Sequence, residues 1–428
     1  MRTLFNTFYF FILGLSLLHG QDISLLHSKG KIPSTYINPA LPLDNTFNLG
    51  LANINFYSEK GGPVISDLTS KNNDGSLYID IKNLDDIKAF NYYLEYDIRT
   101  LDVAFKFRPF TIMAGHGFRS SANITIAPDL IQILKDGNAP YIGQHLELGP
   151  NINVLAFNEL YLGLQKAIGR FTLGARAKLL FGTSSVYTER SHIGFTTLEE
   201  YYQLQFDNDY LIRSSSFLKY DALDDITIDY TQFTFDNLFY NNRGFAVDLG
   251  AAFDVSEHLT LTASALDLGY IKWDYSPRKY ELTGEYTFEG VDIIDYLEDS
   301  TLTITDTLYN LLDVKSSQEK YSTTLNKNFT LGAAYTIHGW SFNALYQLQY
   351  RFDERNHRFS VSAAKKLGIL DIGAMYSMNK NNFKAFGIYT SLYLKPVYVY
   401  ASTQDILGLL NPLDARNISF RFGASLQF

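Results

Sequence analysis

The chain has 428 residues, a formal net charge of −9 and no cysteine. The lack of cysteine excludes disulfides, thiolate metal ligands, a cysteine nucleophile and a lipid-modified N-terminal cysteine. The acidic balance argues against nucleic acid as a partner, because phosphate binding needs a basic surface. A mean hydropathy of −0.09 argues against a bundle of membrane helices, but it is compatible with a membrane barrel, whose strands alternate apolar and polar residues.

The first residues have the pattern of a secretory signal peptide. One basic residue precedes an apolar stretch over residues 4–18, and a glycine stands where cleavage is expected. A membrane anchor is the alternative, but the stretch is short for a span and no basic cluster follows it. We therefore predict a signal peptide over 1–20, then one domain over 21–428 that begins with a lead-in segment, 21–46.

Most of the chain after the lead-in reads as strands in which apolar and polar residues alternate. In one stretch Val247 and Leu249 lie on one face, and Asp248 and Gly250 lie on the other. Segments of about 10 residues, the length of a tilted membrane strand, number about 14, within a range of about 12 to 16. The predicted fold class is therefore all-β, a transmembrane antiparallel β-barrel.

The connections between these strands differ in length. We expect short periplasmic turns on one rim, over residues 337–340, 366–369 and 379–382, and long extracellular loops on the other rim, over 58–90, 128–150, 192–240 and 276–327. The stretches 192–240 and 276–327 are each expected to hold one hairpin or only loop.

The residues opposite the apolar faces decide between a barrel and a soluble β-sandwich. They are mostly Gly, Ser, Ala, Asn and Gln, which suits a crowded polar lumen better than a surface in water. Aromatic residues make up 15% of the chain. Their groups at Tyr92–Tyr93 and over 393–400 are predicted to form girdles at the membrane interfaces.

Three local features stand out from the strands. Residues 128–137 are predicted to form a short loop helix, with Pro in the first turn and Gly past the end, and residues 290–298 are predicted to form another. The alternation changes phase between Ala265 and Leu266. We expect a β-bulge near the rim there; the alternative is a strand bent around a lumen site.

The sequence contains no nucleophile elbow, phosphate-binding loop or metalloprotease helix. His116 lies near Ser120 and Ser121, but nothing nearby completes a hydrolase site. We predict that the protein is not an enzyme and has neither a cofactor nor a metal site.

Charged residues on the predicted lumen faces are the remaining site candidates. They must pair or be hydrated, because a charge facing lipid at the membrane midplane costs about 2–4 kcal/mol. We expect either a structural network or a ring that selects a solute. The candidates are Arg176, Lys178, Asp248, Asp267, Asp371 and Arg421.

Several stretches together carry a resemblance to a known family. They are residues 36–40 (YINPA), 243–250, 259–273, 405–417 and 420–423. With these stretches, the mature chain resembles an uncharacterised family of Bacteroidota outer-membrane β-barrel proteins, a domain of unknown function. The Asn-Pro-Ala motif is distantly similar to barrels of the fatty-acid-transporter type and of type IX secretion. The resemblance implies location in the cell outer membrane and a barrel architecture.

The end of the chain resembles the signal by which outer-membrane barrels are recognised for insertion. Its residues here are Phe422, Leu426 and Phe428. This resemblance implies the barrel-assembly machinery and outer-membrane lipid as partners. For function we expect passage or binding of a small or hydrophobic solute. The alternatives are a scaffold that docks a protein partner in secretion or envelope assembly, and a lipid-modifying enzyme.

Overall fold

The structure is a computed structural model that describes residues 23–72, 76–80, 90–216, 218–222, 225–228, 231, 234–288, 314–352 and 354–428. The predicted signal peptide, the predicted helix over 290–298 and its neighbours lie outside the described residues. None of the helices described is long and apolar enough to cross a membrane.

Fourteen antiparallel strands close into a barrel, which confirms the predicted fold class and strand number. The first and last strands close the ring, with Asn48 opposite Gln427. The pairing ends in two backbone hydrogen bonds between Phe47 and Phe428, of 3.1 and 2.8 Å. Because each strand has a partner on both sides, the barrel has no open edge at this seam.

The barrel strands follow one another around the wall in chain order. They are β1 (Phe47–Gly61), β4 (Phe90–Phe107), β5 (Phe110–Ile126), β7 (Asn151–Ile168), β8 (Phe171–Thr197), β12 (Arg243–Asp254), β13 (Leu259–Trp273), β17 (Asn328–Ile337), β18 (Trp340–Arg351), β19 (Glu354–Leu367), β20 (Leu370–Asn379), β21 (Ala385–Leu394), β22 (Val397–Thr403) and β23 (Asn417–Gln427).

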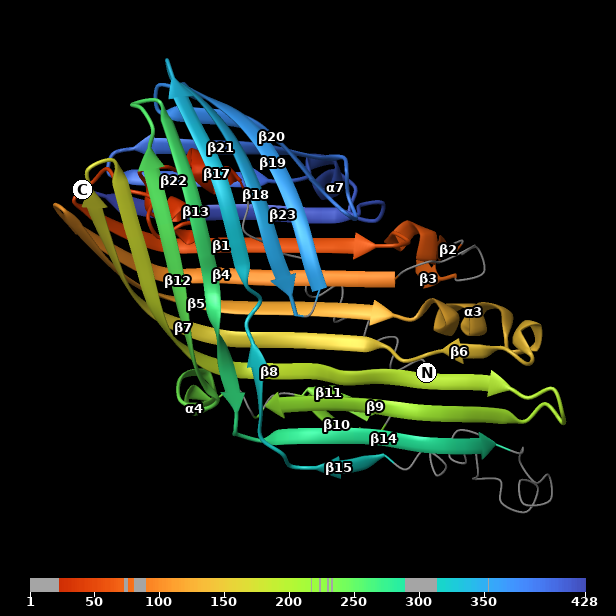
Figure 1. Ribbon diagram of the computed structural model, residues 1–428. Helices are drawn as coiled ribbons and strands as arrows, with labels where there is room; N and C mark the ends of the chain where they lie inside the picture. The colour runs from red at the N-terminus through yellow and green to blue at the C-terminus, as the bar shows by residue number, and fades with distance from the viewer. Residues whose placement is uncertain are drawn as a thin grey trace.

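Beyond the barrel, one side of the wall continues as a sheet of long strands, at the lower right of Figure 1. The first half of β8 pairs with β12, and its second half pairs with β9 (Leu204–Ser216), which in turn pairs with β14 (Pro277–Phe288). Shorter strands complete this side: β6 (His145–Glu147), β15 (Lys315–Ser317) and β16 (Tyr321–Thr324). We call the second half of β8, residues 184–197, together with β6, β9 and β14 the sheet extension.

The long connections between barrel strands contain short hairpins and short helices. They are the hairpins β2 (Thr69–Lys71) with β3 (Leu77–Ile79) and β10 (Leu218–Ala222) with β11 (Asp225–Ile228), and the helices η2 (Ile65–Leu68), α3 (Pro128–Asp136), η4 (Ala139–Tyr141), α4 (Phe235–Phe239) and α7 (Ile406–Leu410). The predicted loop helix is confirmed by α3, and Gly137 after it has a φ of 73°.

The division into short turns and long loops is confirmed, with corrections to individual segments. The turns after β17 and β19 lie on the short rim, but the turn after β20, over residues 379–382, lies on the opposite rim, because each strand reverses direction. The predicted inserts 192–240 and 276–327 contain the long strands β9 and β14. The first insert also holds the hairpin β10–β11, which was one of the two expected alternatives. The strands β9 and β14 pair with each other and extend the wall beyond the barrel.

Side chains alternate between the barrel exterior and the lumen as predicted. On β12, Leu249 points outward and is 48% exposed, whereas its neighbour Asp248 is buried in the lumen. The exterior belt of exposed apolar side chains is the surface that a membrane barrel presents to lipid. The predicted aromatic girdles are wrong in part, since Tyr93, Tyr398 and Tyr400 are buried in the lumen.

The phase change in β13 is a β-bulge, but it lies in the middle of the strand and not near the rim. Val247 pairs with Leu268, and Leu249 pairs with Ala265, so β13 has one extra residue between these pairs. Asp267 adopts a φ of 62°, and its backbone N–H donates to the Asp248 carboxylate at 2.8 Å. The bulge therefore turns the Asp267 side chain into the lumen.

Candidate functional site

The lumen is occupied by the chain's own N-terminal segment, residues 23–43, which we call the plug. It contains α2 (Ser24–His27) and η1 (Ile32–Tyr36), and nearly all of its side chains are buried. Pro33 in the first turn of η1 favours this short helix. The plug folds back on itself where Gly30, with a φ of 85°, bridges to Leu43. The predicted lead-in segment is thus an internal element of the barrel.

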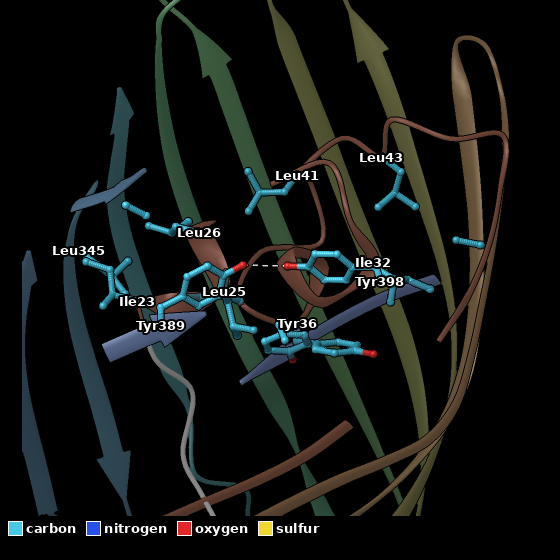
Figure 2. Close-up of a cluster of buried hydrophobic side chains, with 14 of the residues drawn as sticks. Ile23, Leu25, Leu26, Ile32, Tyr36, Leu41, Leu43, Leu345, Tyr389 and Tyr398 are labelled. Carbon is cyan, nitrogen blue, oxygen red and sulfur yellow. Dashed lines mark hydrogen bonds between the residues drawn. The ribbon is translucent and has the colours of Figure 1, made fainter. Parts of the chain in front are cut away.

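An apolar cluster joins the plug to the lumen wall, mainly on the side formed by β18 to β22 (Figure 2). Leu25 and Leu26 of the plug lie in a cluster with Leu345 of β18 and with Tyr389 and Tyr398 of β21 and β22. The Tyr389 and Tyr398 hydroxyls are hydrogen-bonded at 2.8 Å, and the Tyr398 hydroxyl also contacts Ser28 Oγ at 2.8 Å. This wall therefore meets the plug mainly by packing, with hydroxyl groups at the contact.

Asn38, in the Asn-Pro-Ala motif, anchors the plug to the opposite side. Its Nδ2 donates to the carbonyl oxygens of Ala251 and Ala263, which face each other on β12 and β13, at 3.1 and 3.0 Å. Its Oδ1 accepts from the Ala40 backbone N–H at 2.8 Å. A side chain at Gly250 would collide with this group, because its Cβ would lie 2.1 Å from Asn38 Oδ1.

Wall side chains hold the rest of the plug by further hydrogen bonds. Gln165 Nε2 donates to the carbonyl oxygens of Pro39 and Leu41, at 3.0 and 2.9 Å. Ser264 Oγ donates to the Ile37 carbonyl at 2.8 Å. These bonds satisfy backbone groups of an irregular segment that is buried from water. Such a network fixes one position of the plug without a covalent link.

A buried cluster of charges lies on the lumen wall beside the plug, and we call it the central cluster. Lys178 Nζ lies 2.8 Å from Asp248 and 2.7 Å from Asp267. Arg119 also reaches Asp267, at 2.6 Å. Further members are Arg99, Asp97, Glu159, Arg176 and Asp102. Because charges buried in this way need partners, each cation here faces at least one carboxylate.

The central cluster touches the plug at two of its residues, Thr35 and Tyr36. Arg176 Nη2 donates to the Thr35 hydroxyl at 2.6 Å, and Tyr36 donates its hydroxyl to Asp102 at 2.6 Å. The wall residue Tyr161 donates to the same carboxylate. Most of the cluster's ion pairs, however, join one wall strand to another, so they do not depend on the plug.

A second charge cluster lies around Glu59 of β1, which is fully buried. Arg351 Nη1 lies 3.0 Å from Glu59, and Asn379 Nδ2 donates to it at 2.9 Å. The Arg351 guanidinium also lies over the Tyr93 ring, 3.9 Å from its centroid. Between the two clusters is a cavity of about 30 Å³, room for about two water molecules, lined in part by Arg119.

Four of the six predicted lumen residues meet in the central cluster. Arg176, Lys178, Asp248 and Asp267 are all buried there. The other two lie elsewhere in the lumen.

The two outlying residues are Asp371 and Arg421. Asp371 lies near the short-turn rim and accepts from Ser391 at 3.3 Å. Arg421 is buried beside Asn53. The predicted residues therefore do not form one ring around the lumen.

Sequence reasoning missed the partners that complete the clusters. Arg99 and Glu159 are 60 residues apart in sequence, and each lies in a strand without a recognisable motif. A charge on the polar face of a predicted strand could have identified both residues, as it identified Arg176.

The weak hydrolase candidate is not assembled. Thr100 Oγ1 lies 2.8 Å from His116 Nδ1, and the His116 ring packs near Phe239 of α4. Ser121 lies on the other face of the same strand and is buried in the lumen, where Asn326 donates to it. The arrangement gives no nucleophile and base in contact at these residues.

His27 is a titratable group of the plug that is buried against the lumen wall. It lies in α2 and not in a membrane-spanning strand, with its ring 5.1 Å from that of Tyr389 and with Asn343 3.1 Å from its Nδ1. Burial lowers the pKa of His27 from 6.5 to about 4. The imidazole is therefore neutral at pH 7 while the plug is seated.

Solved structures that are similar to the chain are barrels. A TodX monoaromatic hydrocarbon channel mutant is 11% identical with a TM-score of 0.45, covering 92% of this chain and 94% of that one. The Pseudomonas putida toluene transporter TodX is 10% identical (TM-score 0.40; 96% and 94% covered), and the Ralstonia pickettii toluene transporter TbuX is 11% identical (0.35; 92% and 93%). At these values the likeness carries no argument about function.

No curated protein matches the chain. A family model matches residues 39–404, which span most of the barrel and include Pro39 and Ala40 of the Asn-Pro-Ala motif. The match ends at Gln404, before the last strand. The chain belongs to the family of unknown function DUF5723.

Proposed function

We propose that the protein lies in the cell outer membrane as a barrel closed by its own plug, and that it passes or binds a small hydrophobic solute when the plug is displaced. The exterior apolar belt supports the membrane location. The proposals of a Bacteroidota origin, of a cleaved signal peptide and of insertion by the barrel-assembly machinery through Phe422, Leu426 and Phe428 rest on the sequence. A non-enzymatic role is part of the proposal.

The observation that carries this function is the apolar surface beneath the plug. The wall residues that form it include Leu345, Met375, Tyr389 and Tyr398, and the plug covers them. Displacement of the plug would expose these side chains inside the barrel, where an apolar solute with one polar group would find both packing surface and hydroxyl partners.

The plug itself is held in a way that allows displacement. Its contacts with the wall are hydrogen bonds, ring packing, apolar contacts and a partly exposed ion pair between Lys29 and Asp254, at 4.0 Å. Individual hydrogen bonds contribute about 0.5–1.5 kcal/mol each, and exposed ion pairs contribute about 1 kcal/mol or less. The plug is joined to β1 at the short-turn rim, so it can leave the lumen without unfolding the wall.

The test uses the natural lack of cysteine. Ser24 Oγ of the plug lies 2.9 Å from Ser402 Oγ of β22, so the pair Ser24→Cys and Ser402→Cys can lock the plug with one disulfide. We expect a fluorescent hydrophobic probe to bind the reduced barrel and to be excluded from the oxidised barrel.

A matched control locks two wall strands instead. Ser360 and Ser377 face each other on β19 and β20, with their hydroxyls 2.8 Å apart. The pair Ser360→Cys and Ser377→Cys should bind the probe equally in both redox states. Equal probe binding by the oxidised and reduced plug-locked protein would contradict the proposal.

The scaffold function remains a second candidate because of the sheet extension. The hairpin between β8 and β9 ends in Tyr201 and Tyr202, which are 87% and 65% exposed and both have positive φ. Exposed aromatic residues are enriched at protein interfaces. A photocrosslinker at Tyr201 in intact cells should capture one defined envelope protein if this candidate is right, and none if it is wrong.

A further inference from the structure

The sheet extension carries a group of polar side chains on one face of three adjacent strands. Glu147 of β6, Gly194 of β8 and Asp207 of β9 lie side by side in the paired register. His145 of β6 and His192 of β8 lie two residues from this row, on the same face of their strands. Two imidazoles and two carboxylates therefore surround one position.

A glycine forms the floor of this group. A Cβ at Gly194 would lie 2.1 Å from Asp207 Oδ1, so the Asp207 carboxylate occupies the space that any other residue would fill. The surrounding side chains are partly open to solvent: His145 is 54% exposed, His192 41% and Asp207 38%. The result is a solvent-accessible group of nitrogen and oxygen donors around Gly194.

The donor atoms have the spacing of metal ligands. His192 Nε2 lies 2.9 Å from Asp207 Oδ2, and His145 Nδ1 lies 3.8 Å from Asp207 Oδ1. One donor atom from each of these three residues lies within 4.8 Å of the others. In a tetrahedral site with bonds of about 2.0–2.1 Å, ligand atoms lie about 3.3 Å apart, so small side-chain rotations complete the geometry.

Glu147 supplies the outer contact that fixes a metal-binding imidazole. Its Oε2 lies 2.6 Å from His192 Nδ1, the nitrogen that faces away from Asp207. Its Oε1 accepts from the backbone N–H groups of Ile193 and Gly149, at 2.9 and 3.1 Å. A carboxylate held in this way keeps Nδ1 protonated and leaves Nε2 free to bind a metal.

We propose that His145, His192 and Asp207 bind one divalent cation of the zinc class, with Glu147 as the positioning residue and an open fourth place for water. Two imidazoles and one carboxylate suit Zn²⁺ better than Ca²⁺ or Mg²⁺, which prefer oxygen ligands alone. The site is independent of the plug. It joins β6, and hence the loop over residues 139–150, to β8 and β9, so the cation stabilises the outer rim of the extension.

The test is a titration of the folded barrel, without an affinity tag, with Co²⁺ as the spectroscopic probe. Wild-type protein should bind one equivalent, give the visible absorption of a tetrahedral or five-coordinate site, and release Co²⁺ when Zn²⁺ is added. His145→Ala and Asp207→Asn should abolish the signal. Glu147→Gln should weaken Co²⁺ affinity by about 10- to 100-fold while retaining the spectrum.

The matched control is His258→Ala, an exposed histidine in the turn after β12, which should leave binding unchanged. Amide hydrogen exchange gives a second measurement: Zn²⁺ should slow exchange at residues 145–149 in the wild type and not in Asp207→Asn. The proposal is overturned if the folded wild type shows no saturable Co²⁺ binding, or if His145→Ala and Asp207→Asn both retain it.

Discussion

The two sides of the lumen hold the plug in different ways. The side formed by β4 to β13 carries the central cluster, whose charges pair mainly with one another across wall strands. The side formed by β18 to β22 presents apolar groups and tyrosine rings that are covered by the plug itself. The charges of the first side are paired within the wall, whereas the apolar groups of the second side are covered by the plug. The difference indicates the surface on which a solute would take the place of the plug.

We expect the largest loss of stability from a substitution that removes a charge from the central cluster. Lys178→Met keeps the length of the side chain but leaves Asp248 and Asp267 with one cation fewer. Removing one member of a buried ion pair costs about 3–5 kcal/mol, so we expect the free energy of unfolding in urea to fall by that amount. Lys272→Met, at an exposed position on β13, is the control and should change it little. A small loss for Lys178→Met would mean that the cluster is hydrated.

The next effect tests which face of β12 meets lipid. Leu249→Arg places a charge on the exterior belt and should destabilise the barrel by about 2–4 kcal/mol in denaturant titrations in lipid. Leu249→Ala should lower the stability of the barrel much less, since it adds no charge. Equal stability of the arginine variant and the wild type would refute the assignment of this face.

Gly250→Ala acts on the plug from the neighbouring lumen position. The added Cβ would overlap Asn38 Oδ1, and such overpacking costs about 1–3 kcal/mol. The wall should stay folded while the plug opens more often. Trypsin should then cut after Lys29 or Lys31 about tenfold or more faster than in wild type or Leu249→Ala, as followed by mass spectrometry. Unchanged cleavage would show that the plug tolerates displacement of Asn38.

The smallest effect is a pH dependence on the apolar side. The pKa of His27 is about 4 with the plug seated and about 6.5 when it is exposed, so protonation favours the displaced plug. The stability of the seated plug should be constant above pH 6.5 and fall as the pH drops from 6.5 toward 4. Trypsin susceptibility at pH 5 should exceed that at pH 7.5 after correction for protease activity, and His27→Gln should lose this difference.

The fold could be predicted from the sequence because strand alternation is a local pattern. The two faces of β12 and β23 follow directly from the order of residues such as Asp248 and Leu249. The plug could not be predicted, since its short helices have no pattern that tells whether they lie inside a lumen or outside it. Its Asn-Pro-Ala motif was visible, but the hydrogen bonds of Asn38 to β12 and β13 join residues more than 200 positions apart.

The candidate site was partly predictable for the same reason. A charge on a polar strand face marks a lumen residue, as at Lys178, but its partners depend on barrel register. Asp371 and Arg421 carry the same local signal and lie apart from the central cluster. The group around Gly194 has no local motif, because His145, His192 and Asp207 come from three strands.

The central claim is that the plug closes the barrel, and planar-bilayer conductance of the plug-locked pair Ser24→Cys and Ser402→Cys tests it most directly. Folded protein is selected by its heat-dependent gel mobility, and the same membrane is recorded before and after a reductant is added. We predict no conductance steps from the oxidised protein and reproducible steps after reduction, with steps unaffected by redox state in the Ser360→Cys and Ser377→Cys control. Steps of equal size and frequency in the oxidised and reduced plug-locked protein would contradict the account.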